Sequence, residues 1–168
     1  NREKIPGEEA AIVELGNLEK TYPKNTAILF AKTFLQAENG HFDEALVNAE
    51  KLLTVQPEAA LNWLMKGQIL ESLNKKDEAL NSYLKATSLD STNADAWQNM
   101  AGVLLKTNKF DEAIDSYNKA IQLVPAEPSF IYNRGCAYCL KGDNANALAD
   151  LEKAISMDPK NNEARLKL

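Results

Sequence analysis

The chain has few residues of the types that carry out chemistry. Cys136 and Cys139 form a C-x-x-C pair in the middle of a predicted helix, where the two side chains share one face. A redox pair of this kind prefers a helix N-terminus, which stabilises the thiolate. A zinc site needs about four Cys or His ligands, and the chain has only these two cysteines and one histidine, His41. We therefore expect two small semi-buried cysteines, no metal and no cofactor.

Adjacent carboxylates occur three times, as Asp-Glu at 43–44, 77–78 and 111–112. Paired carboxylates are the residues of general acid–base catalysis. Each pair, however, stands at the start of a predicted helix, where negative charge complements the helix dipole. His41 lies in a connector and is expected to be exposed. With no glycine-rich phosphate loop and no Ser-His-Asp set, the chain is not expected to be an enzyme.

Composition narrows the possible partners. The 168 residues include 19 Lys and Arg against 24 Asp and Glu, for a net charge of −5, and only three of the cations are Arg. A duplex binder needs a dense basic face, so no nucleic acid is expected. No apolar run approaches the roughly 20 residues that span a bilayer, so no membrane insertion is expected either. A leader is not visible, which favours a cytoplasmic protein.

A period of 34 residues runs through the chain. Residues 76–83 are echoed by residues 110–117, and Trp63 is echoed by Trp97, in both cases 34 positions later. Prolines follow the same spacing, with one place taken by a serine: Pro23, Pro57, Ser91, Pro125 and Pro159. Such self-similarity is the signature of a repeat architecture.

The period and its residues resemble the tetratricopeptide repeat family, whose pattern is W-x₂-L-G-x₂-Y, then A-x₃-F, then P. The third copy carries it as Trp97, Ala101, Leu104, Ala113, Tyr117 and Pro125. The resemblance implies an all-α, right-handed superhelical solenoid of antiparallel helix hairpins. Four repeats are expected at 26–59, 60–93, 94–127 and 128–161. Residues 1–25 would hold the second helix of a partial upstream repeat, and 162–168 would start a further first helix.

Amphipathic patterning supports the hairpins independently. Apolar residues recur at steps of three and four within 94–107 and again within 110–123, as on one face of a helix. Short polar connectors separate the two helices of each repeat, at Asn39-Gly40, Asn74-Lys75, Thr107-Asn108-Lys109 and Lys141-Gly142. Small residues are expected to let the two helices approach, with Gly67, Ala101 and Gly135 facing Ala79, Ala113 and Ala147. Large residues are expected to fill the space between hairpins, namely Trp63, Trp97, Tyr83 and Tyr117.

A stack of hairpins normally ends in polar capping repeats, and neither end of this chain reads as one. We expect an interior stretch of a longer repeat protein, the alternative being a short protein with irregular ends. The resemblance also implies that first helices line a concave groove that holds an extended peptide. The expected groove is apolar in its N-terminal half and polar in its C-terminal half. Its candidate binding residues are Phe30, Phe34, Leu64, Gln68, Gln98, Asn99, Tyr132 and Asn133.

Asn99 and Asn133 recur at one place in adjacent first helices. A side-chain amide has a donor and an acceptor, so a row of amides can bind a peptide backbone. The alternative is that asparagine is simply a neutral surface residue there. Phe30, Phe34, Leu64 and Met65 would form an apolar pocket, unless they pack against an upstream segment. A clamp for a terminal carboxylate, known in this family, is not expected because its basic residues are missing, and Arg134 is expected to face a neighbouring hairpin.

The leading hypothesis is a noncatalytic protein-interaction scaffold that binds a protein or peptide partner in its groove. A second hypothesis is self-assembly into a homo-oligomer, because uncapped apolar ends can stack head to tail. A third is that the chain is the substrate-binding arm of a larger enzyme, such as a glycosyltransferase, whose catalytic domain lies outside it.

Overall fold

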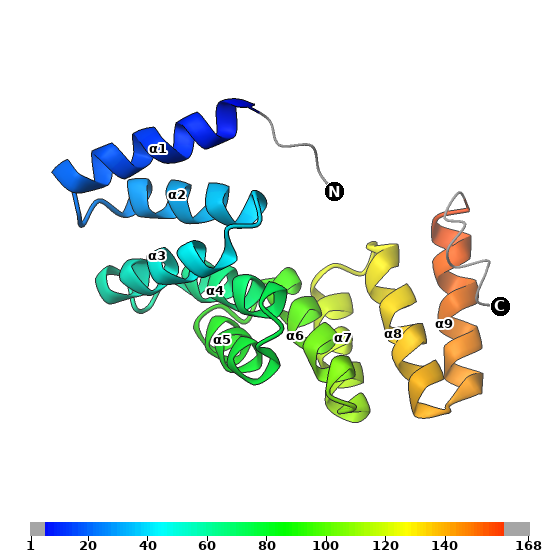
Figure 1. Ribbon diagram of the computed structural model, residues 1–168. Helices are drawn as coiled ribbons and strands as arrows, with labels where there is room; N and C mark the ends of the chain where they lie inside the picture. The colour runs from blue at the N-terminus through cyan, green and yellow to red at the C-terminus, as the bar shows by residue number, and fades with distance from the viewer. Residues whose placement is uncertain (1–5, 160–168) are drawn as a thin grey trace. The chain divides into compact units, whose positions relative to one another are not determined.

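The computed structural model describes residues 6–159, and within them the chain forms nine helices and no strand (Figure 1). The predicted all-α fold of helix hairpins is therefore confirmed. The expected helix start at 162–168 lies outside the described residues. The helices are α1 (Pro6–Thr21), α2 (Thr26–Glu38), α3 (Phe42–Val55), α4 (Ala60–Ser72), α5 (Lys76–Leu89), α6 (Ala94–Lys106), α7 (Phe110–Leu123), α8 (Pro128–Lys141) and α9 (Asn144–Met157).

The chain divides into two compact units, of residues 1–89 and 90–168. In the first unit, α1 packs on α2, α2 on α3, α3 on α4 and α4 on α5, and α2 also touches α4. In the second unit, α6 packs on α7, α7 on α8 and α8 on α9. Each helix thus packs mainly on its neighbours in sequence, as expected of stacked hairpins.

Four tight turns close the hairpins, one at each predicted connector. Each turn holds one residue in the left-handed region, with φ of 80° at Gly40, 58° at Asn74, 59° at Asn108 and 86° at Gly142. Glycine and asparagine are the residues that adopt this conformation most easily. Four of the helices that these turns join begin 34 residues apart, at Thr26, Ala60, Ala94 and Pro128.

Glycines allow the two helices of a hairpin to approach. A Cβ added to Gly67 would lie 2.6 Å from Cδ1 of Tyr83 and closer still to Cε1. A Cβ at Gly135 would lie 3.2 Å from Cγ of Leu151. The groups nearest to these glycines belong to Tyr83, one turn after Ala79, and to Leu151, one turn after Ala147, with its neighbour Asp150.

Tyr83 also lies inside its own hairpin rather than between hairpins. Its side chain is fully buried, and its hydroxyl donates a hydrogen bond of 3.0 Å to Oε2 of Glu71. Burial raises the pKa of this hydroxyl, and the Glu71 charge and hydrogen bond raise it further. The tyrosine therefore stays a neutral donor that ties α5 to α4.

The two tryptophans join α4 and α6 to the loops that precede these helices. The indole N–H of Trp63 donates to the carbonyl of Pro57 at 2.7 Å, and that of Trp97 donates to the carbonyl of Ser91 at 3.0 Å. Trp97 packs against Ala94, Ala120 and Phe130, which come from three successive helices. Its predicted place between hairpins is confirmed.

A cation on a first helix joins neighbouring hairpins. Arg134 of α8 donates two hydrogen bonds of 2.7 Å to the carboxylate of Asp150 in α9 and one of 2.6 Å to Oδ1 of Asn118 in α7. The hydrogen bonds that the guanidinium donates to Asp150 raise its pKa, although burial acts to lower it. Arg134 therefore faces the neighbouring hairpin, as predicted, and joins three helices.

Gly67→Ala is expected to destabilise the first unit by about 2 kcal/mol, because the Tyr83 ring leaves no room for a methyl group. Gly102→Ala in α6 is the matched control. A Cβ there meets nothing within 4 Å, so alanine is expected to add up to about 1 kcal/mol through its higher helix propensity. Urea unfolding followed by circular dichroism measures both changes. Equal effects of the two substitutions would contradict the packing argument.

Asp150→Ala is expected to cost about 2 kcal/mol, because it leaves a partly buried guanidinium without its carboxylate. The control is Lys141→Ala, which removes the ion pair of 2.6 Å between Lys141 and Asp111. Both partners of that pair are exposed, so no measurable loss is expected. Chemical denaturation of the two variants makes the comparison, and comparable losses would show that Asp150 has no special role.

Candidate functional site

In the second unit, the predicted polar residues occupy equivalent places on α6 and α8. Gln98 and Asn99 are the fifth and sixth residues of α6, and Tyr132 and Asn133 are the fifth and sixth of α8. All four side chains are partly exposed. Within residues 6–159, neither Asn99 nor Asn133 uses its amide in a hydrogen bond of its own fold. Two amides therefore remain available on matching turns of two first helices.

The start of each helix fixes the direction in which these residues point around the helix axis. Oδ1 of Asn93 caps α6 by accepting from the N–H of Ala96 at 3.0 Å, and Oε1 of Glu127 caps α8 by accepting from the N–H of Ser129 at 3.2 Å. The opposite side of α6 is buried through residues such as Met100 and Ala101. With one side fixed in the core and both helices starting at the same point of the period, the sixth residue of each helix points to the same exposed side.

In the first unit, the predicted residues on α2 and α4 differ in exposure. Phe34 is 50% exposed, and Gln68 is exposed as well. Phe30 is half-buried and packs against the core formed around Leu29 and Met65. Leu61, at the start of α4, is 54% exposed and adds to the apolar surface of this unit.

Leu64 and Met65 do not offer such a surface. Each has only 6% of its area exposed, and Met65 belongs to the core cluster. The expected pocket of four exposed apolar residues is therefore not present in this form. The physical reason is that α4 packs between α3 and α5 and also touches α2, so more of its circumference is covered than that of a surface helix.

The residues of catalytic type lie apart from one another. Cys139 is exposed and Cys136 partly buried, and neither of these two residues in the body of α8 is in a disulfide bond. His41 lies 3.5 Å from Oε1 of Glu9. The Asp-Glu pairs lie in the first turns of α3, α5 and α7. Among the described residues, no three Cys, His, Asp or Glu side chains are grouped as metal ligands, and no helix is long and apolar enough to span a bilayer.

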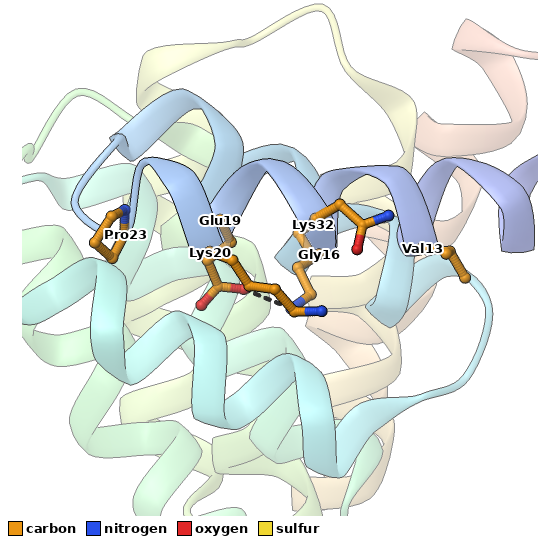
Figure 2. A pocket seen from close by; sticks show the side chains of 7 residues that line it. Val13, Gly16, Glu19, Lys20, Pro23 and Lys32 are labelled. Atoms are coloured by element: carbon orange, nitrogen blue, oxygen red, sulfur yellow. Dashed lines mark hydrogen bonds and ion pairs between the residues drawn. The ribbon is translucent and has the colours of Figure 1, made fainter.

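One pocket was not anticipated from the sequence. It has a volume of about 510 Å³ and lies between α1 and α2 (Figure 2). Its lining consists of Val13, Gly16, Asn17, Glu19, Lys20, Pro23 and Lys32. The signal that points to it is Gly16, a glycine inside a predicted helix with no partner to approach.

Glu19 organises the charges beside this pocket. It accepts hydrogen bonds from Lys32 at 2.6 Å and from Lys51 at 2.7 Å. Partial burial acts to raise the pKa of this carboxyl, but the two lysines outweigh it and lower the pKa below its ordinary value. Glu19 therefore remains ionised at neutral pH and joins α1 to both α2 and α3.

Family models match most of the chain. The tetratricopeptide repeat model matches residues 128–161, and a second TPR repeat model matches residues 102–142. A model of subunit 3 of the anaphase-promoting complex, or cyclosome, matches residues 38–120. A comparison with curated protein sequences gives no match.

Solved structures with this fold include MamA, at 22% identity and a TM-score of 0.87 over 93% of this chain and 91% of that one. YrrB, described as a TPR protein with an unusual peptide-binding site, has 22% identity and a TM-score of 0.83 over 96% and 84%. TTC0263, described as a thermophilic TPR protein in Thermus thermophilus, has 20% identity and a TM-score of 0.74 over 95% and 88%. The matching repeat models, the 34-residue period and the hairpin fold together show that this chain belongs to the tetratricopeptide repeat family.

Proposed function

We propose that the chain is a noncatalytic protein-interaction scaffold that binds an extended peptide segment on the exposed side of α6 and α8. The observation that carries the proposal is the pair Asn99 and Asn133. Each amide is partly exposed and is not used in the hydrogen bonds of the described fold. Because each amide has a donor and an acceptor, it matches one peptide unit of a bound chain.

Contacts to the backbone alone make such a surface tolerant of sequence. Gln98, next to Asn99, adds a third amide, and Tyr132, next to Asn133, adds a phenol ring. No lysine or arginine occupies the fifth or sixth place of α6 or α8, so a terminal carboxylate has no cation to bind there. The proposed ligand of the second unit is therefore an internal, extended segment of a partner protein.

The first unit, taken by itself, offers a different kind of contact. Phe34 and Leu61 each expose about half of their area, and Gln68 is exposed on the same helix as Leu61. We assign them to apolar side chains of a partner, because exposed apolar groups on a folded surface often mark interaction sites. The peptide-binding site named for YrrB, a protein of the same fold, supports a peptide as the class of ligand.

Asn99→Ala and Asn133→Ala are each expected to weaken peptide binding about fivefold, which corresponds to one lost hydrogen bond of about 1 kcal/mol. The probe is a linear peptide selected from a displayed random library on the intact chain, and its affinity is measured by fluorescence anisotropy. Gln122→Ala, which removes an exposed amide from α7, is the matched control and is expected to leave the affinity unchanged.

Backbone recognition has a second readout. Methylating the backbone nitrogens of the selected peptide removes the N–H donors that an asparagine oxygen would accept. The parent chain is expected to bind the methylated peptide more weakly than the unmethylated one. The variant with both asparagines replaced is expected to bind the two peptides equally. If both Asn variants keep full affinity and circular dichroism shows an intact fold, the proposal that Asn99 and Asn133 bind the peptide is refuted.

Self-association is a second candidate, favoured by exposed apolar residues in each unit. Tyr22, just after α1, is 56% exposed, and Leu148 of α9 is 49% exposed. If these surfaces meet head to tail, the sedimentation coefficient will rise with protein concentration. Tyr22→Ser with Leu148→Ser is expected to abolish the rise. A parent chain that stays monomeric at high concentration would exclude this candidate.

A further inference from the structure

Packing does not require a glycine at position 16, as it does not at Gly102 in α6. Gly67 and Gly135 lie against Tyr83 and Leu151, where a larger residue has no room. At Gly16, a Cβ would meet only Nζ of Lys32, at an ordinary 3.9 Å. A glycine inside a helix lowers its stability relative to alanine. Gly16 differs from Gly102 in that its missing side chain leaves open space beside a cation, Lys32.

The repeat itself indicates what belongs in that place. The residues equivalent to Gly16 and Lys32 are Glu50 and Lys66 one period later, and Asn118 and Arg134 three periods later. Glu50 accepts a hydrogen bond of 3.1 Å from Lys66, and Asn118 accepts one of 2.6 Å from Arg134. The remaining copy has Leu84 and Met100, neither of which is charged. In both polar copies, an oxygen from this place meets a cation on the next helix.

Between α1 and α2 that oxygen is missing, and the pocket of about 510 Å³ lies in its place. Because position 16 has no carboxylate equivalent to that of Glu50, Lys32 donates its hydrogen bond to Glu19 (Figure 2). Glu19 is shared with Lys51, so two lysines face one carboxylate. Lys20 also lines the pocket, and no described residue pairs with it. The surroundings thus carry an excess of positive charge.

We infer that this pocket receives an acidic side chain, a glutamate, from a segment of a partner protein. Its carboxylate would lie between the amines of Lys32 and Lys20, in the role that Glu50 has toward Lys66 within the chain. Its methylene groups would contact the apolar walls formed by Val13 and Pro23. The amide of Asn17 adds a donor at the rim.

This acidic-residue pocket is separate from the peptide face under the proposed function. Lys32 lies two residues from both Phe30 and Phe34, which is about 200° around α2. The side of the helix that holds the pocket is therefore nearly opposite to the side that exposes Phe34. A partner can occupy one surface while the other is filled, and either proposal can fail without the other.

The test is an NMR titration of the intact ¹⁵N-labelled chain with the peptide acetyl-Ala-Leu-Glu-Glu-Leu-Ala-amide. Saturable shifts are expected at the amides of Val13, Gly16, Asn17 and Lys20. The same peptide with both glutamates replaced by glutamine is expected to bind at least about tenfold more weakly, because it lacks the charge that the lysines attract.

Gly16→Glu supplies the missing carboxylate from the chain itself, as Glu50 does for Lys66. It is expected to abolish the titration while the protein stays folded. Gly16→Ala is the matched control, since its methyl group leaves most of the volume open; it is expected to keep the titration and to raise the melting temperature. Lys20→Gln is expected to weaken binding severalfold. Lys119→Gln removes an exposed lysine of α7 and is expected to leave binding unchanged.

Equal shifts with the glutamine peptide, or an unchanged titration in Gly16→Glu, would overturn the inference. Shifts confined to the amides around Phe34 and Leu61 would also overturn it. They would remain consistent with the proposal that Phe34 and Leu61 contact a partner. If neither peptide produces saturable shifts around Gly16, the pocket has no role in binding acidic segments.

Discussion

The close contact between a glycine on one helix and a bulky side chain on the next is the constraint on which the α4–α5 and α8–α9 hairpins depend. Tyr83 reaches its buried position only because Gly67 has no side chain, and Leu151 stands in the same relation to Gly135. This contact fixes the rotation of both helices about their axes. The exposed positions of α4 and α8 follow from that rotation, so the placement of Gln68 and Asn133 is decided inside the hairpin.

Polar contacts then join one hairpin to the next. Lys32, Lys66 and Arg134 hold the same place in the period, and each bonds to an oxygen on the preceding helix. The preceding helix supplies that oxygen in different ways. Glu50 and Asn118 reach from the equivalent position, whereas Glu19 reaches from one turn further along, beside Gly16. A substitution that the fold tolerates has thus changed the outer surface, with the repeat otherwise kept.

The 34-residue period and the turn residues were enough to predict the hairpins, because asparagine and glycine mark the left-handed turns. The side of a helix that faces solvent was harder to predict for α4. That helix carries apolar residues on most sides, so its periodicity could not show that Leu64 and Met65 are buried. The α1–α2 pocket could not be predicted, because it arises from the absence of a side chain at Gly16 and not from a motif.

The two tryptophans that form the indole hydrogen bonds allow the compact units to be followed separately by fluorescence. Trp63 and Trp97 are its only tryptophans, and one lies in each compact unit. Each indole is held against a loop carbonyl that it loses when its own unit unfolds. Replacing either one by phenylalanine leaves a single fluorophore, whose emission then follows one half of the protein alone. The cooperativity between the two halves is thereby open to direct optical measurement.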